Sequence, residues 1–131
     1  MRIMIDSNVI VSAIYNPKSK PARVLHHVCE NHVLVLCDHI VAECYDVIER
    51  KFPQHTVVLD KLLAVLGYEL VATPRAGLTM SDPKDVPILN AAVLADVDIV
   101  VSGDHHFLSL DMERLKIFNP AQYLESEGLE A

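Results

Sequence analysis

The chain has 131 residues, of which 51% are hydrophobic, and its formal net charge at pH 7 is −7. This size and apolar content predict one folded domain with a substantial core and exclude a disordered chain. The negative charge excludes a basic module that holds nucleic acid through phosphate contacts alone. It does not exclude a nuclease whose acidic residues bind metal.

Cysteine content and hydropathy indicate the cellular compartment of the protein. Cys29, Cys37 and Cys44 are too few, and odd in number, for a disulfide framework. No apolar run reaches the roughly 18–20 residues of a membrane span, and Asp6 interrupts the first apolar stretch too early for a signal peptide. We therefore expect a cytoplasmic protein without a membrane segment, folded over residues 1–124 and followed by an acidic C-terminal tail over 125–131.

Apolar runs of strand type alternate along the chain with segments of helical spacing. This alternation predicts an α/β fold, with a parallel sheet covered on both faces and a ligand site beyond the carboxyl ends of its strands. In chain order, we expect a strand over 2–6, a helix over 21–31, a strand over 32–37, helices over 40–51 and 54–66, a strand over 68–72, a helix over 86–95, a strand over 98–102, a short helix over 105–110 and a strand over 116–119.

Two acids come directly after predicted strands. Asp6 closes the first strand, and Asp104 follows the strand over 98–102. Either residue could simply cap a helix that begins there, but two acids at strand ends of one sheet also favour a functional site. Asp82 and Asp85 lie in a run with two prolines that is typical of a helix start, where a carboxylate can cap the helix, bind a metal, or do both.

Glu43 is a fourth position of interest. At about 100° per residue, it falls on the margin of the apolar face of the helix over 40–51, where a solvated glutamate is the ordinary alternative to a functional one. Several carboxylates that meet at one point repel each other unless a cation lies between them. Ligation by oxygen alone suits Mg²⁺ or Mn²⁺.

The order and spacing of these motifs resemble the PIN domain family, from Met1 to about residue 123. The resemblance rests on Asp6-Ser7-Asn8 after an apolar strand, on Glu43 within a helix, on the run from Asp82 to Ala92, and on the strand that leads through Ser102-Gly103 to Asp104. The second half is similar to PIN proteins described as toxin components of prokaryotic toxin–antitoxin pairs.

The resemblance implies a three-layer αβα sandwich, Rossmann-like, with a five-stranded parallel sheet. It implies a metal-dependent endoribonuclease that hydrolyses RNA phosphodiester bonds as the toxin of a toxin–antitoxin pair, with Mg²⁺ or Mn²⁺ as cofactor, an antitoxin partner and a homodimeric state. Carried over by position, the catalytic and metal-binding acids are Asp6, Glu43, Asp85 and Asp104. Asp82 is a further metal ligand, and Asn8 and Ser102 are supporting polar residues.

The same residues also allow other kinds of protein. A PIN fold without catalysis would be an interaction module, although the complete set of acids disfavours it. A phosphatase with an aspartyl nucleophile needs Asp-x-Asp after the first strand, and this chain has Asp6-Ser7-Asn8. A zinc site is disfavoured because the histidines and cysteines show no CxxC or HxxxH spacing. His105 and His106 adjoin Asp104, where either could contact a phosphate or simply lie exposed.

Overall fold

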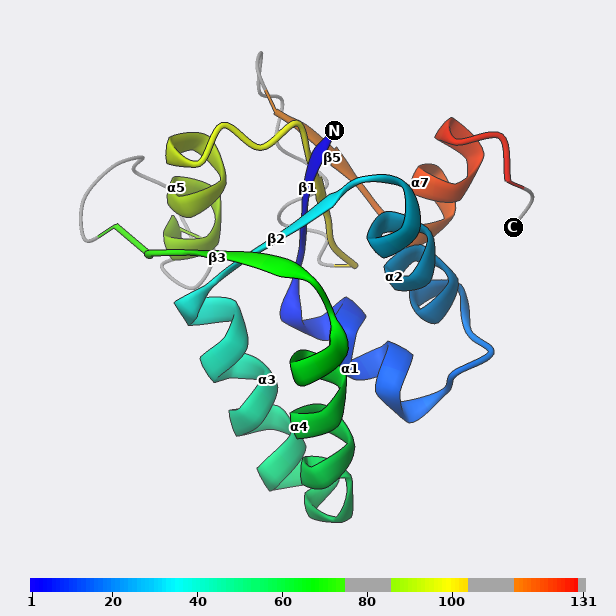
Figure 1. Cartoon of the computed structure of the whole chain (residues 1–131), viewed down its shortest axis with the longest axis vertical. Coiled ribbons are helices and arrows are strands. Elements are labelled where there is room, and N and C mark those ends of the chain that lie inside the picture. Colours follow the sequence, from blue (N-terminus) through cyan, green and yellow to red (C-terminus); the bar gives the residue numbers. More distant parts are fainter. Residues whose placement is uncertain (75–85, 104–114, 130–131) are drawn as a thin grey trace.

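The computed structural model describes residues 1–74, 86–103 and 115–129. Within these residues, five parallel strands form one sheet in the order β3-β2-β1-β4-β5 (Figure 1). The strands are β1 (Arg2–Ile5), β2 (Val33–Cys37), β3 (Tyr68–Val71), β4 (Ile99–Val101) and β5 (Lys116–Phe118). In the centre, Ile3 of β1 pairs with Leu34 on one side and with Ile99 on the other. The predicted α/β class and the five-stranded parallel sheet are confirmed.

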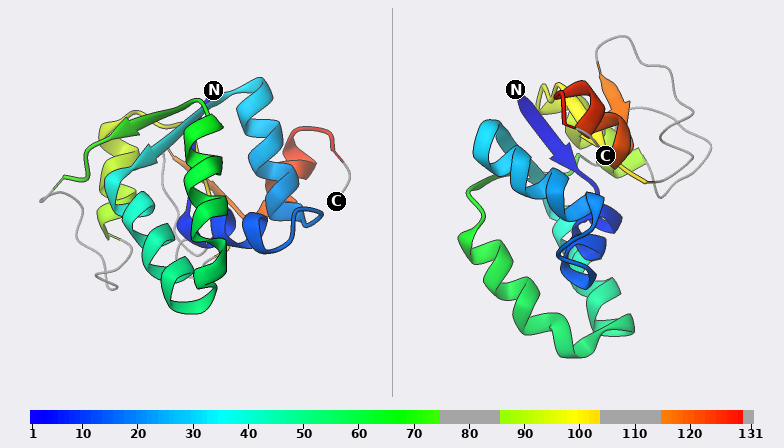
Figure 2. Two further views of the ribbon diagram at one scale, coloured as in Figure 1. Left: turned by 60° about the horizontal axis from the view of Figure 1, so that its bottom comes forward. Right: turned by 90° about the vertical axis from the view of Figure 1, so that its right-hand side faces the viewer.

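Helices cover both faces of this sheet. Figure 2 shows α2 and α4 on one side and α5 on the other, which gives the three layers that the sequence predicts. The C-terminal helix α7 packs against α2 and β5. The helices are α1 (Ser7–Tyr15), α2 (Lys20–Asn31), α3 (Asp38–Lys51), α4 (Thr56–Val65), α5 (Val86–Leu94) and α7 (Pro120–Ser126), and a single 3-10 turn, η1 (Pro53–His55), precedes α4.

Burial explains why the strands are apolar without alternation. Ile3, Met4 and Ile5 of β1 are fully buried, since both of their sheet faces are covered by helices. On α3, Ile40, Cys44 and Ile48 form a fully buried stripe at a spacing of four residues. This stripe fixes the rotation of α3 and places Glu43, next to Cys44, at the margin that the sequence predicts.

Two helices in the structure were not predicted from the sequence. Helix α1 follows β1 directly; its β-branched residues Val9, Ile10, Val11 and Ile14 favour strand by propensity, but they are buried, and this packing outweighs the propensity. Helix α7 begins at Pro120 and is preceded by the N-cap Asn119, in a capping box in which the side chains of Asn119 and Gln122 each accept the backbone N–H of the other residue.

The chain remains helical past residue 124, the predicted end of the domain. Helix α7 runs to Ser126, and Leu129 packs against the core. The division into a domain and an acidic tail stays a prediction. The expected helix over 105–110 lies outside the described residues, and among the described helices none is long and apolar enough to cross a membrane.

Candidate active site

Asp6 lies where β1 ends and α1 begins, and it is 4% exposed. It is the N-cap of α1, since Oδ1 accepts the backbone N–H of Ser7 at 2.7 Å. Its other oxygen, Oδ2, accepts the hydroxyl of Ser102 at 2.9 Å, from the end of the neighbouring strand β4. Both oxygens are therefore held, and the carboxylate is fixed at the carboxyl edge of the sheet.

Glu43 reaches the same point from α3. The Ser7 hydroxyl donates to Glu43 Oε1 at 3.2 Å and lies 3.4 Å from Asp6 Oδ1, so it contacts both carboxylates. One turn earlier on α3, His39 places Nε2 3.6 Å from Glu43 Oε1. The Glu43 side chain is 38% exposed, so this acid lies at the open side of the site, whereas Asp6 lies at its floor.

The surroundings of Asp6 disfavour its negative charge. Burial raises the pKa of Asp6 to about 6, and the nearby charge of Glu43 acts in the same direction. The hydrogen bonds from Ser102 and Ser7 oppose this rise because they stabilise the carboxylate. A cation bound between the two acids would favour the charged form of Asp6.

Asn8 and Ser102, the two supporting residues that the resemblance implies, lie beside this pair. The backbone N–H of Gly103 donates to Asn8 Oδ1 at 3.5 Å, and Ser102 is fully buried. These contacts tie the first turn of α1 to the end of β4. The two residues thus support the position of Asp6, and their role in catalysis stays a prediction.

Four residues are brought together here, namely Asp6, Asn8, Glu43 and Ser102. The predicted acids Asp82, Asp85 and Asp104, and the neighbouring His105 and His106, lie outside the described residues. Asp6 and Glu43 offer hard oxygen donors at the edge where parallel α/β sheets bind ligands. Their chemistry fits Mg²⁺ or Mn²⁺ better than a softer metal.

Ser7 and His39 are the neighbours of the acids that sequence reasoning missed. Ser7 stands inside the motif Asp6-Ser7-Asn8, and His39 precedes Glu43 by four residues, a spacing that places both on one helix face. Asp38, an acid directly after β2, has a different role. Its carboxylate accepts the backbone N–H of Thr73 at 2.7 Å, and this bond joins the ends of β2 and β3.

Cys44 lies next to Glu43 and faces the core. Burial raises the pKa of its thiol to about 12, with smaller contributions from the charges of Asp6 and Glu43. The thiol therefore stays protonated at neutral pH and is a poor nucleophile and a poor metal ligand. This agrees with the interpretation of Cys44 as a core residue.

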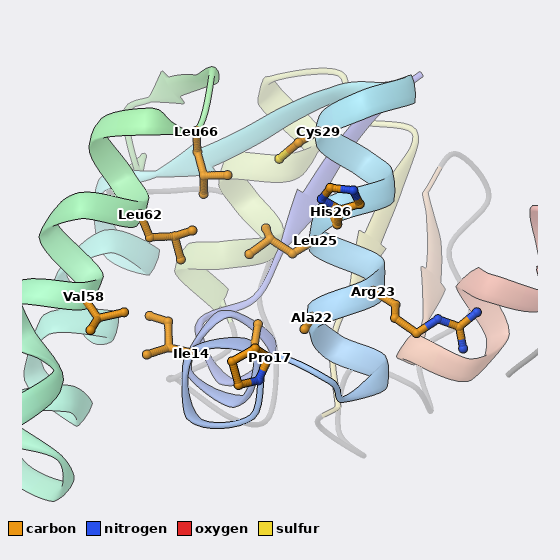
Figure 3. Close-up of a pocket in the computed structure, with 11 residues that line it drawn as sticks. Ile14, Pro17, Ala22, Arg23, Leu25, His26, Cys29, Val58, Leu62 and Leu66 are labelled. Carbon is orange, nitrogen blue, oxygen red and sulfur yellow. The ribbon is translucent and has the colours of Figure 1, made fainter.

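A second feature of the surface is an apolar cavity of about 500 Å³ between α1, α2 and α4. In Figure 3, Leu25 of α2 faces Leu62 and Leu66, and Ile14 lies below them. Arg23 and His26 supply charged and polar atoms at its α2 side. The cavity begins at the C-terminal half of α1, whereas Asp6 caps the N-terminal end of the same helix.

Comparison with known proteins identifies the class. A family model described as "PIN domain" matches residues 2–106, and the chain therefore belongs to the PIN domain family. Among solved structures it is similar to "VapBC2 from Rickettsia felis bound to a DNA fragment from their promoter", with a TM-score of 0.69 and 18% sequence identity over 91% of this chain and 98% of that chain. No curated protein matches at a significant level.

Proposed function

We propose that the protein is a divalent-metal-dependent endoribonuclease that acts as the toxin of a toxin–antitoxin pair. The observation that carries this proposal is the pair of carboxylates, Asp6 and Glu43, that meet at the Ser7 hydroxyl on the carboxyl edge of the sheet. Membership of the PIN domain family supports a nuclease, and the similar VapBC2 structure supports the toxin–antitoxin setting.

In this proposal, Asp6 and Glu43 bind Mg²⁺ or Mn²⁺, together with Asp85, Asp104 and, as a further ligand, Asp82. A metal ion held by these residues would lower the pKa of a water molecule and supply positive charge at the phosphate. Ser102 and the Ser7 backbone hold both oxygens of Asp6 and prevent the side chain from turning away. No serine, cysteine or histidine nucleophile is required.

The test is a cleavage assay on single-stranded and structured RNA in EDTA, Mg²⁺ and Mn²⁺. We expect cleavage only with metal, and a loss of at least about a hundredfold in Asp6→Asn and Glu43→Gln, since each substitution removes a metal-binding charge. The matched control is Glu49→Gln, because Glu49 is an exposed glutamate of the same helix. It should cleave as wild type does.

A negative result in this assay would point to a different function. If the wild type folds but neither binds metal nor cleaves RNA, the acids are helix caps and surface charges. The protein is then a non-catalytic interaction module with a PIN fold. Cleavage that is equal in Asp6→Asn and wild type would also contradict the proposed site.

The partner in this proposal is an antitoxin protein that packs into the apolar cavity between α1, α2 and α4. The cavity offers leucine and valine side chains, which suit the apolar face of a partner helix. Helix α1 spans nine residues, so a partner at Ile14 would lie about 12 Å along the helix from the cap Asp6. This is close enough for the bound chain to extend to the site.

The homodimer implied by the resemblance stays a prediction. Exposed apolar side chains at the end of α5, Val93 and Leu94, support it, because a self-complementary contact would cover them. Sedimentation equilibrium of the purified chain measures the oligomeric state directly.

A further inference from the structure

A second group of metal-ligating side chains lies at the opposite edge of the sheet from Asp6. His27 belongs to α2, His32 follows the end of α2 just before β2 begins, and Glu127 follows the end of α7. One ligand atom from each of the three residues lies within 4.8 Å of the other two. In the described part of the chain, no other trio of histidine, cysteine or acidic residues meets this condition.

We propose that His27, His32 and Glu127 bind one zinc ion, or a similar transition-metal ion, that joins α2 to α7. Two imidazoles and one carboxylate form a ligand set that zinc uses where a fourth position is left for water. It differs from the all-oxygen set around Asp6, so the two sites would select different metals. The inference does not depend on the proposed ribonuclease activity.

The geometry around the trio supports a metal site. With metal–ligand distances of about 2.1 Å, tetrahedral donors lie about 3.4 Å apart. To admit an ion, the hydrogen-bonded pair His32 and Glu127 would separate and His27 would move inward, each by on the order of 1 Å. His32 and Glu127 are already in contact, and their side chains are only 14% and 20% exposed. The donors are thus shielded from most of the water that would compete for the ion.

A neighbouring group orients one of the two imidazoles. The Tyr123 hydroxyl lies 2.7 Å from His27 Nδ1, where its oxygen can accept the ring N–H and leave Nε2 for a metal. The amino group of Met1 lies 3.2 Å from His32 Nδ1. As an ammonium it can only donate, so a metal on His32 Nε2 would require this amino group to be neutral or displaced. Tyr123 is fully buried, so this support is rigid.

The position also favours a cation. His32 is the C-cap of α2, a helix of twelve residues, and Glu127 is the C-cap of α7. The carboxyl ends of helices carry partial negative charge, so both helices present that charge to the space between the three side chains. No short motif in the sequence signals this trio, because His32 and Glu127 are 95 residues apart.

Zinc alone is the probe for this site. Zn²⁺ is titrated into the metal-free full chain in the presence of millimolar Mg²⁺, which occupies the acidic site near Asp6 and competes poorly for imidazole. We expect one equivalent of Zn²⁺ to bind to the wild type. His32→Gln and Glu127→Gln should each weaken this binding at least about a hundredfold, and Tyr123→Phe about tenfold, because it removes only the hydroxyl that orients His27.

The matched control is His26→Gln. His26 adjoins His27 but is exposed and pairs with Glu30 on its own helix, so its loss should not change zinc binding. Substitution of Co²⁺ in the wild type should give the visible absorption of a tetrahedral ion, a readout that needs no variant. If the wild type binds no zinc in excess Mg²⁺, or if the His32 and Glu127 variants bind it as the wild type does, the trio is a hydrogen-bonded contact between helices and the proposal is wrong.

Discussion

Asp6 combines two roles at the scale of a single residue, since it caps α1 and forms the floor of the acidic site. Its burial has a thermodynamic cost in the absence of metal. Because the pKa is raised to about 6 from an ordinary value of 3.8, the folded state holds the proton more tightly than the unfolded chain does. The stability that this provides is complete below about pH 4 and is lost as the pH rises through 6. At neutral pH the ionised group lowers the free energy of unfolding by about 3 kcal/mol relative to that acidic limit.

We therefore predict that Asp6→Asn stabilises the metal-free protein at pH 7.5 by about 1–3 kcal/mol, since asparagine fills the same space without a charge. This gain in stability should disappear at pH 4, where Asp6 is protonated in the folded wild type. Thermal unfolding of both proteins in EDTA, at pH 4 and at pH 7.5, measures the difference in stability. Added Mg²⁺ should raise the melting temperature of the wild type and not that of the variant. An Asp6→Asn variant that is equally destabilised at both pH values would contradict this account.

At the scale of elements, the helix ends carry information that hydrophobic periodicity does not. The strands and the helices α2 to α5 follow from periodicity. Helix α1 does not, because its residues are apolar on nearly every side and β-branched, and only the Asp6 cap distinguishes it from a strand. Helix α7 is short, and its signal lies in Asn119, Pro120 and Gln122, a capping box with proline at the first helical position.

We predict that Asn119→Ala lowers the free energy of unfolding by about 1 kcal/mol, because it leaves the N–H of Gln122 without its cap. Urea unfolding monitored by circular dichroism measures the change. Ser12→Ala, at an exposed position within α1, is the control and should be nearly neutral. If Asn119→Ala lowers the free energy of unfolding no more than the control does, α7 is held in place by the packing of Tyr123 and Leu124 alone.

At the scale of the whole molecule, the sheet and the location of the site could be predicted because parallel strands bring their carboxyl ends to one edge. Asp6, Asn8, Glu43 and Ser102 meet there as expected. The contacts of Ser7 and His39 could not be predicted, since they depend on the rotation of α3 that the stripe of Ile40, Cys44 and Ile48 imposes. The positions of Asp82, Asp85 and Asp104 stay predictions.

The cavity between α1, α2 and α4 leads to a prediction at this scale. On the proposed toxin function, expression of the protein arrests growth, and co-expression of an antitoxin should restore growth for the wild type and not for Leu62→Asp, because a charge in the apolar cavity disfavours the partner. RNA cleavage by the purified Leu62→Asp variant should stay within about twofold of wild type, since Leu62 belongs to α4, which contributes none of the acids of the site. Val65→Asp, at an exposed position of the same helix that does not line the cavity, is the control. Full rescue of the Leu62 variant would place the partner elsewhere.

The sheet order has a consequence for the time at which the site forms during synthesis. The central strand β1 is made first, but its second neighbour β4 pairs with it across 96 residues, Ile3 with Ile99. At about 5–20 residues per second, a ribosome needs about 5–20 s to make that stretch. Until then one edge of β1 has no strand to pair with, and Ser102 is not yet there to hold Asp6. The contacts that hold both oxygens of Asp6 are therefore completed only after Ser102 has been made and β4 has paired with β1.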